Sequence, residues 1–343
     1  MKSLTRSITL AALLALSAQS IAATPDLKEL ANYAGVSEYS LNEALKLATL
    51  QPKIIATMTR PSEAKPWWQY RKIFITTSRI QAAVKFYEKY ERQLNEAYAR
   101  FGVPPEIVCA IIGVETYFGK NMGNFKVLDA LYTLGFNYPP RQSYFSKEFA
   151  NFVALCLREN WDITSVLGSY AGAMGMGQFM PSSYLNYAID FDNDGHVNLF
   201  NDPDDAIGSV ANYFKAHGWQ NGRGIYYPVH IKNANAQKLI DLKWDLTPEV
   251  LYAEGASTKV NLSPDQNIRL FAFALEDGTT SYAVGLNNFK TIMRYNTSPL
   301  YARAVYELSE FIRMEYIKHK NAGGIALHPQ GRQPWSKKVV VYF

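Results

Sequence analysis

The longest regular pattern of apolar and polar positions covers residues 77–101. Apolar side chains recur there every three or four positions, which is the spacing of one helix face. Gly102 would end this helix, and the pair Pro104-Pro105 would start another, because proline is favoured in a first helical turn. The pattern therefore predicts one long amphipathic helix, followed directly by a second helix.

Shorter patterns divide the rest of the chain. Helical spacing begins after the capping residues Asp26 and Ser40 and recurs in three later segments, at 143–161, 288–293 and 301–313. Short extended runs predict strands near 226–231, 268–273 and 281–285, with a turn signal at 276–279. We therefore expect a mainly α protein of the α+β class, with a small antiparallel β unit.

The N-terminus has the pattern of a secretory signal. Lys2 and Arg6 precede an apolar run of about nine residues, and Ser20-Ile21-Ala22 offers a small-x-small cleavage site. The apolar run is too short to span a membrane, and no cysteine lies near the cleavage site to carry a lipid anchor. We expect export to a bacterial periplasm as a soluble protein.

Charge narrows the choice of partners. The formal net charge of +5 falls to +3 without residues 1–22, which hold Lys2 and Arg6 and no acidic residue. This mild positive charge is compatible with an anionic polymer but is too small to indicate nucleic-acid binding.

Glu115 stands out because it ends the apolar run from Val108 to Val114. On a helix its carboxyl group would project from a largely apolar face, and desolvation would raise its pKa. A carboxylic acid that stays protonated near neutral pH can act as a general acid. The alternative is a structural carboxylate at a helix end, paired with an amide or an arginine.

A glycine-rich segment offers a second feature. Residues 168–184 read GSYAGAMGMGQFMPSSY, and their glycines allow the backbone to approach a neighbour closely. Gln178 offers both a hydrogen-bond donor and an acceptor to sugar hydroxyl or acetamido groups. Close helix packing would explain the same glycines.

Four motifs together resemble the lytic murein transglycosylases of the B type. They are VETYFGKNMG at 114–123, LDALYTLGFNYPPR at 128–141, the glycine-rich segment, and DAIGSVANYFKAHGW at 205–219. The resemblance covers about residues 30–313. It implies a lysozyme-like helical core with peptidoglycan glycan strands as substrate and no cofactor for catalysis.

The resemblance also implies a mechanism with one catalytic carboxyl group, which maps to Glu115. This glutamate would protonate the leaving oxygen of the β-1,4 bond between N-acetylmuramic acid and N-acetylglucosamine. It would then deprotonate the muramyl 6-hydroxyl, which closes to a 1,6-anhydro sugar. No second acid lies within two turns of Glu115 or in the glycine-rich segment, although most glycosidases need two.

Substrate-binding residues are implied by the same resemblance. They map to Tyr70, Arg141, Ser169, Gln178, Tyr213, Asn296 and Tyr301. One departure concerns the stem peptide, because relatives carry two adjacent arginines where this chain has Pro140-Arg141. The missing cation affects the expected contact with the stem peptide rather than the chemistry.

The segment DFDNDGHVNLFNDPDD at 190–205 begins like an EF-hand. Asp190, Asp192 and Asp194 occupy positions 1, 3 and 5, Gly195 makes the turn, and His196 would offer its backbone carbonyl. Position 12 is Asn201 rather than glutamate, so the closing ligand must lie elsewhere. The resemblance maps it to Asp205, with Asp204 as the rival. We expect a structural Ca²⁺, with an acidic turn as the alternative.

These observations give a provisional domain plan. We expect a signal peptide over 1–22, a helical subdomain over 23–103, a catalytic core over 104–221, a β subdomain over 222–287, core helices over 288–317 and a loose tail over 318–343. Cys109 and Cys156 lie in apolar helical patterns, which favours buried thiols over a disulfide.

Three hypotheses for function remain at this point. The first is an exported, monomeric lytic transglycosylase, for which cell-wall synthesis proteins are possible partners. A lysozyme-like hydrolase would instead use water as acceptor, and its product would be one water heavier. A non-catalytic peptidoglycan-binding protein would release no sugar.

Overall fold

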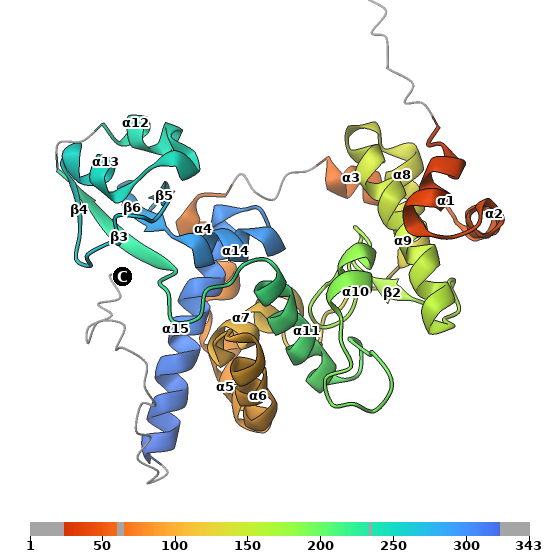
Figure 1. Cartoon of the computed structure of the whole chain (residues 1–343), viewed down its shortest axis with the longest axis horizontal. Helices are drawn as coiled ribbons and strands as arrows, with labels where there is room; N and C mark the ends of the chain where they lie inside the picture. Colours follow the sequence, from red (N-terminus) through yellow and green to blue (C-terminus); the bar gives the residue numbers. More distant parts are fainter. Residues whose placement is uncertain (1–23, 60–64, 233–234, 323–343) are drawn as a thin grey trace, which may run out of the picture.

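The computed structural model describes residues 24–59, 65–232 and 235–322. The predicted signal peptide lies outside the described residues, as does the part of the predicted tail beyond Ala322, whereas residues 318–322 are helical rather than loose. Figure 1 shows a helical group at one end of the molecule, a small sheet at the other end, and a set of long helices between them. The mainly helical α+β prediction is confirmed.

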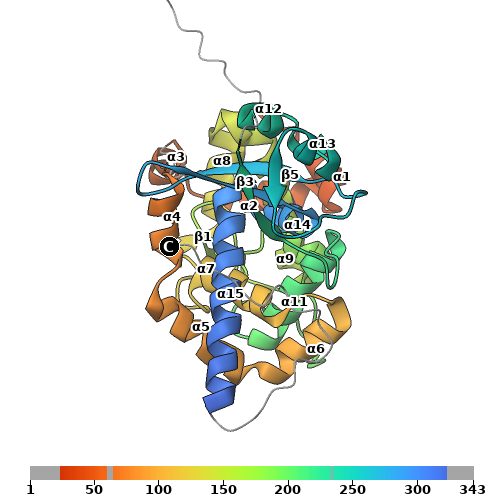
Figure 2. The same cartoon turned by 90° about the vertical axis from the view of Figure 1, so that its left-hand side faces the viewer.

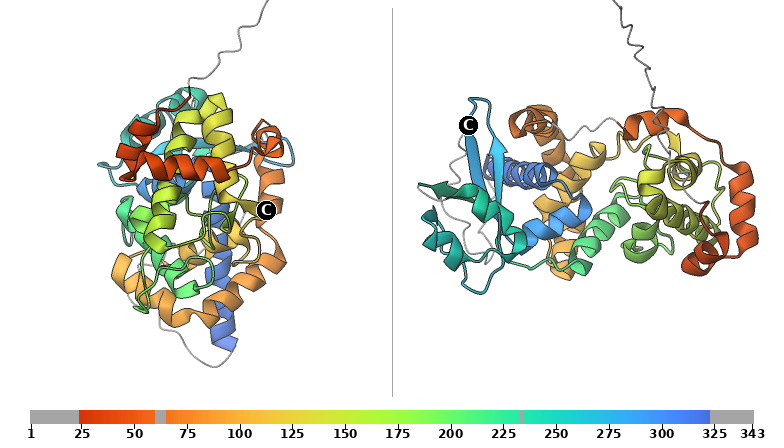
Figure 3. Two further views of the ribbon diagram at one scale, coloured as in Figure 1. Left: turned by 90° about the vertical axis from the view of Figure 1, so that its right-hand side faces the viewer. Right: turned by 90° about the horizontal axis from the view of Figure 1, so that it is seen from above.

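The helical group at one end combines segments that are distant in sequence. It contains α1 (Leu27–Ala34), α2 (Glu38–Leu47), α3 (Pro52–Met58), α8 (Val127–Asn137) and α9 (Gln142–Glu159), and the left view of Figure 3 shows α1 and α2 across its outer face. Buried Asp129 accepts hydrogen bonds from the Thr49 amide (2.9 Å) and the Gln51 side chain (3.1 Å). These bonds attach the segment that precedes α3 to helix α8.

Two details of the first helices can be compared with the sequence. Asp26 caps α1 as predicted, because its side chain accepts from the amides of Lys28 and Glu29. The prediction that Ser40 starts the next helix is wrong. Ser37 caps α2, and Ser40 lies inside the helix with its amide bonded to the Ser37 hydroxyl at 3.0 Å.

The long helices between the two ends share one continuous hydrophobic core with the helical group. They are α4 (Trp67–Phe74), α5 (Thr77–Lys89), α6 (Glu91–Phe101), α7 (Pro105–Thr116), α11 (Pro203–Ala216), α14 (Asn287–Tyr295) and α15 (Pro299–Ala322). Figure 2 shows α15 running the length of this part of the molecule. It contacts α4, α5 and α7. Every residue of α7 is buried except Glu115, which is half-buried.

The predicted helix over 77–101 is broken into two. Tyr90 adopts φ −112° and ψ 27°, which ends α5 and starts α6. The break turns α6 so that it packs against α11, while α5 packs against α15. Apolar periodicity continues through Tyr90, so the pattern alone could not reveal the change of direction.

The β unit forms a four-stranded antiparallel sheet in the order β4-β3-β6-β5. Its strands are β3 (Tyr226–Ile231), β4 (Ala256–Thr258), β5 (Arg269–Ala274) and β6 (Thr280–Gly285), and the three strands predicted from sequence are confirmed. The short helices α12 (Ala236–Asp241) and α13 (Pro248–Ala253) and the 3₁₀ helix η3 (Lys243–Asp245) complete the unit, which the right view of Figure 3 shows beside α15. Part of the sheet has a small core of its own.

The remaining elements are short. They are β1 (Phe125–Lys126), β2 (Leu167–Gly168), the 3₁₀ turn η2 (Pro139–Arg141) and α10 (Pro181–Tyr187). Cys109 and Cys156 are buried free thiols, as expected. Within the described ranges no one helix has the length and apolarity needed to cross a membrane, and only α6 and α7 together, bent by 113° at their break, meet that test.

Candidate active site

Glu115 lies in the last turn of α7, where the chain leaves the core. Tyr117 and Phe118 follow with positive φ values of 53° and 60°, so the chain turns back sharply. The Phe118 ring folds onto α7, where a Cβ on Gly113 would come within 2.7 Å of it. A glycine at position 113 is therefore required for this exit, which holds Glu115 at the edge of the core.

The carboxyl group of Glu115 is strongly desolvated. Burial raises its pKa to about 7, and a hydrogen bond from the Tyr301 hydroxyl, which favours the charged form, opposes the shift. The Tyr301 Oη to Glu115 Oε1 distance is 2.5 Å. No second carboxylate in the described part of the chain contributes to this pKa. The sequence-based expectation of a raised pKa is therefore met by the structure.

Two predicted tyrosines, from the neighbouring helices α15 and α4, lie close to each other near Glu115. Tyr301 stands in the first turn of α15 and is buried, and both burial and Glu115 raise its pKa. Tyr70 of α4 is close enough to Tyr301 to add to that rise, and its ring packs on Phe74 at 5.1 Å. Of the residues predicted from sequence, Tyr301 makes direct contact with Glu115.

Tyr295 was not among the site residues predicted from sequence. It ends α14, its hydroxyl donates to the Gly177 carbonyl at 2.6 Å, and burial together with Glu115 raises its pKa. Its ring lies 4.8 Å from that of Tyr213, whose hydroxyl donates to the Arg294 carbonyl at 2.8 Å. Tyr213, a site residue predicted from sequence, therefore packs against Tyr295, and Tyr295 in turn is close enough to Glu115 for the carboxyl group to raise its pKa. The only sequence signal was the position of Tyr295 beside Asn296.

The glycine-rich segment is fastened to the end of α7. The Thr116 hydroxyl donates to the Met176 carbonyl at 2.8 Å and accepts from the Gly119 amide at 2.9 Å. Gln178 has a positive φ of 51°, and its Nε2 donates to the carbonyls of Met122 (3.1 Å) and Gly175 (3.0 Å). The amide donor of Gln178 therefore holds the loop, which leaves its side-chain oxygen for a ligand.

Ser169 lies where the glycine-rich segment meets the loop after α7. Its hydroxyl accepts from the amides of Ala171 (3.2 Å) and Ala173 (3.0 Å) and closes a tight turn. Next to it, Gly123 has φ +96°, and a Cβ at that position would lie 2.0 Å from the Gly168 carbonyl oxygen. The two loops approach each other so closely that only glycine fits at position 123.

Two predicted residues are on the surface. Arg141 ends η2 and lies over the rings of Tyr144 and Phe145, at 4.9 and 5.0 Å from their centres. Tyr144 is near enough to Tyr213 to affect its pKa, so Arg141 lies on the α9 side of the site. Asn296 follows α14, is exposed, and accepts from the Ser298 amide at 3.0 Å.

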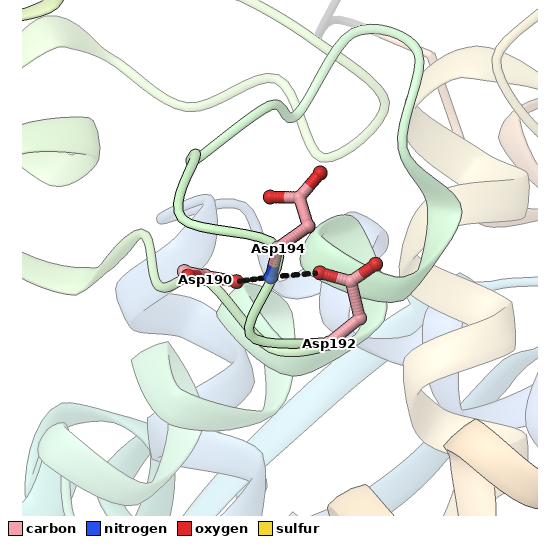
Figure 4. Close-up of side chains that lie close together, drawn as sticks. All are labelled: Asp190, Asp192 and Asp194. Atoms are coloured by element: carbon pink, nitrogen blue, oxygen red, sulfur yellow. Dashed lines mark hydrogen bonds between the residues drawn. The ribbon is translucent and has the colours of Figure 1, made fainter.

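The acidic loop gathers its carboxylates as the sequence suggested. Asp190, Asp192 and Asp194 have oxygens within 4.8 Å of one another, and Figure 4 shows the Asp194 amide between Asp190 and Asp192. The exposed His196 follows, with its amide bonded to Asp194 at 2.8 Å. Partial desolvation, together with the nearby charges of Asp194, Asp202 and Asp190, raises the pKa of Asp192.

A second acidic cluster joins the same loop to α11. It consists of Asp192, Asp202 and Asp205, again with oxygens within 4.8 Å. Buried Asp205 accepts from the amides of Phe191 and Asn198, both at 2.7 Å, whereas Asp204 accepts from Gln93 of α6 at 3.0 Å. The geometry thus groups Asp205, rather than Asp204, with the loop. Sequence reasoning missed Asp202, which also caps α11.

Comparisons with known proteins agree with this arrangement. A family model described as "Transglycosylase SLT domain" matches residues 20–310. Membrane-bound lytic murein transglycosylase B of Escherichia coli is 41% identical over 300 residues, which cover 84% of this chain and 82% of that protein.

Solved structures give the same result. Catenated lytic transglycosylase SltB1 from Pseudomonas aeruginosa superposes with a TM-score of 0.79 and 42% identity, covering 84% of this chain and 96% of that one. The Escherichia coli lytic transglycosylase SLT35 in complex with calcium has a TM-score of 0.76 and 40% identity, covering 86% and 94% of the two chains.

The fold and the site define an enzyme of the transglycosylase class with a lysozyme-like helical core. More specifically, the chain belongs to the family of lytic murein transglycosylases of the B type. The family and the class of enzyme predicted from the sequence motifs are therefore confirmed.

Proposed function

We propose that the protein cleaves the β-1,4 bond between N-acetylmuramic acid and N-acetylglucosamine in peptidoglycan, with Glu115 as the one general acid and base. The observation that carries this proposal is the carboxyl group of Glu115, whose pKa is raised to about 7 by burial without help from another carboxylate. Two-carboxylate glycosidases keep their acids within about 10 Å of each other, where their charges interact.

The proposed chemistry needs two proton transfers, one from Glu115 and one back to it. Protonated Glu115 donates to the glycosidic oxygen, the bond from that oxygen to C1 breaks, and the substrate's acetamido group stabilises the positive charge at C1. The Glu115 carboxylate then takes the proton of the muramyl 6-hydroxyl, whose oxygen bonds to C1. The products are an N-acetylglucosamine end and a 1,6-anhydro-muramyl end, and Glu115 is protonated again.

Tyr301 positions the acid in this scheme. Its hydroxyl bond fixes one carboxyl oxygen and stabilises the carboxylate formed after the first proton transfer. The other carboxyl oxygen is left for the substrate. Tyr295 holds the Gly177 carbonyl, and Tyr213 packs behind it. We assign substrate contacts to Tyr70, Arg141, Ser169, Gln178, Tyr213, Asn296 and Tyr301.

The acidic loop is proposed to bind a structural Ca²⁺. Its donors are all oxygens, which Ca²⁺ prefers, and a bound cation would relieve the repulsion between Asp192 and its acidic neighbours. Asp190, Asp192, Asp194, Asp202 and Asp205 would hold the ion together with the His196 carbonyl. Such an ion would brace the start of α11, which carries Tyr213. A related transglycosylase was solved as a calcium complex.

The substrate also suggests where the protein works. Peptidoglycan lies outside the cytoplasmic membrane, so we propose a periplasmic location, which agrees with the signal pattern in the first 22 residues.

Mass spectrometry of products from purified sacculi tests the activity. The wild type should release anhydro-muropeptides, and Glu115→Gln should lose at least about 100-fold in rate, the usual contribution of a general acid. Glu249→Gln, which removes an exposed carboxylate from α13, is the matched control and should keep full activity. Products with ordinary reducing ends would instead indicate water as the acceptor.

The pH dependence provides a second test. Because Glu115 must be protonated to act first, kcat/KM should fall as pH rises above about 7. A rate that stays constant up to pH 9 would contradict the assignment.

A further inference from the structure

A second pocket lies between the β unit and α14, apart from the candidate active site. Its lining includes Arg223, Trp244, Asp265, Asn267, Asn287 and Lys290, and we call it the junction pocket. Its volume is about 290 Å³, near the lower end for ligand sites, which suits one sugar residue rather than a long segment. It lies at the start of α14, whereas Tyr295 ends that helix, roughly 12 Å further along the axis.

The walls of the junction pocket are held in place by a buried side chain. Asn288 is fully buried, and its Oδ1 accepts from the Gln220 amide at 2.8 Å. Its Nδ2 donates to the carbonyls of Gln220 (2.9 Å) and Arg223 (3.0 Å). The loop that carries Arg223 is therefore fixed to α14 without any ligand, which lowers the entropy cost of binding.

The chemistry of the lining fits an acidic sugar. The half-buried Trp244 ring packs edge-on against Phe271, and the Lys290 ammonium group lies 5.3 Å from the Trp244 ring centre. The indole offers a flat apolar surface for the C–H face of a sugar ring. Arg223 and Lys290 contribute two positive charges against the single negative charge of Asp265. Asn267 and Asn287 add amide groups that can bond to hydroxyl or acetamido groups.

We propose that the junction pocket is a second saccharide site, which binds a muramyl residue through its sugar ring and its acidic substituent. The acidic group can be the free lactyl carboxylate of a residue without peptide. Where the lactyl group carries a stem peptide in amide linkage, a carboxylate of that peptide takes the same role. The ligand class rests on the proposed function of the enzyme. Binding here would keep the enzyme on the sacculus while Glu115 acts on another part of the glycan.

The test measures binding apart from turnover, in the Glu115→Gln background. Co-sedimentation with sacculi is compared for Trp244→Ala and for the double variant Arg223→Ala/Lys290→Ala. The controls are Tyr39→Ala and Lys46→Ala on α2, an exposed ring and an exposed ammonium group far from the pocket. We expect about tenfold weaker binding for the pocket variants and no change for the controls.

Three soluble ligands distinguish the sources of the charge. They are a peptide-bearing muropeptide, a glycan stripped of peptide, and a neutral oligomer of N-acetylglucosamine. Each is titrated by calorimetry with and without the Arg223→Ala/Lys290→Ala substitutions, so that the difference reports binding at the junction pocket. Binding of either acidic ligand, with weak binding of the neutral one, supports the proposal and identifies the acidic group. Equal binding of all three overturns it.

The outcomes also separate this proposal from the proposed function. If the Arg223/Lys290 variant binds sacculi as tightly as the controls, the junction pocket is not a saccharide site, whatever the products are. This variant changes two exposed side chains, so it decides the question even if Trp244→Ala fails to fold. A wild type that forms no anhydro product would instead refute the proposed activity.

Discussion

Replacing Glu115 with glutamine should stabilise the protein at alkaline pH. In the folded protein the carboxyl group keeps its proton up to about pH 7, whereas its ordinary value of 4.5 applies in the unfolded chain. Between these pH values the folded state binds more protons, so the free energy of unfolding falls as pH rises. The loss is complete above pH 7, and the shift corresponds to about 3 kcal/mol.

The substitution by glutamine removes this loss of stability at high pH but keeps the hydrogen bond with Tyr301. Its side-chain oxygen can still accept from the Tyr301 hydroxyl, but it carries no charge to desolvate. We therefore expect Glu115→Gln to be only slightly more stable than the wild type at pH 5. At pH 8.5 its advantage should be larger by roughly 2 to 3 kcal/mol.

Urea unfolding at the two pH values, at a fixed Ca²⁺ concentration, measures this difference. Glu249→Gln removes the same charge from an exposed position, so it corrects for the change in net charge. Other titrating groups are present in every variant, and their contributions cancel when the pH dependences are subtracted. A Glu115→Gln advantage that is the same at pH 5 and pH 8.5 would show that the carboxyl group is not desolvated.

Three further predictions concern Tyr301, the acidic loop and Gly123. Tyr301→Phe removes the bond that favours the Glu115 carboxylate, so the alkaline limb of the pH–rate profile should move upward by about one pH unit; an unchanged limb would contradict this. Ca²⁺ at 100 times its Kd should raise the free energy of unfolding of the wild type by about 3 kcal/mol, and it should stabilise the Asp192→Asn variant less. Equal stabilisation of the wild type and the variant would exclude the acidic loop as the binding site. Gly123→Ala should destabilise the protein by more than about 2 kcal/mol in thermal unfolding, because its Cβ would meet the Gly168 carbonyl at 2.0 Å; a Tm within a degree of the wild type would show that the loops can separate.

The raised pKa of Glu115 could be predicted from sequence because its surroundings are local. The apolar run before it and the glycines after it lie within a dozen residues, and helical spacing predicts which face the carboxyl group shares. Tyr295 could not be found in this way. Its importance comes from contacts with Gly177 and Tyr213, which are distant in sequence, and no local pattern records them.

The arrangement of the first helices was also beyond local reasoning. The predicted subdomain over 23–103 divides in the structure, because α1 and α2 pack against α9 while α4 and α5 pack against α15. Apolar periodicity shows that each helix has a partner but does not identify it. The choice between Asp204 and Asp205 likewise depends on the rotation of α11, which turns Asp204 toward Gln93.

Glu115 and Asp205 show how one physical effect can serve two purposes. Burial raises the pKa of both carboxyl groups, to about 7 and about 6. Asp205 accepts two backbone amide bonds and lies among other carboxylates, so its surroundings hold several negative charges that one bound cation would neutralise together. Glu115 has one bond, from a tyrosine, and no carboxylate nearby that shifts its pKa, so a single proton is enough. The number of acidic neighbours, rather than burial itself, thus separates the proposed metal ligand from the proposed acid.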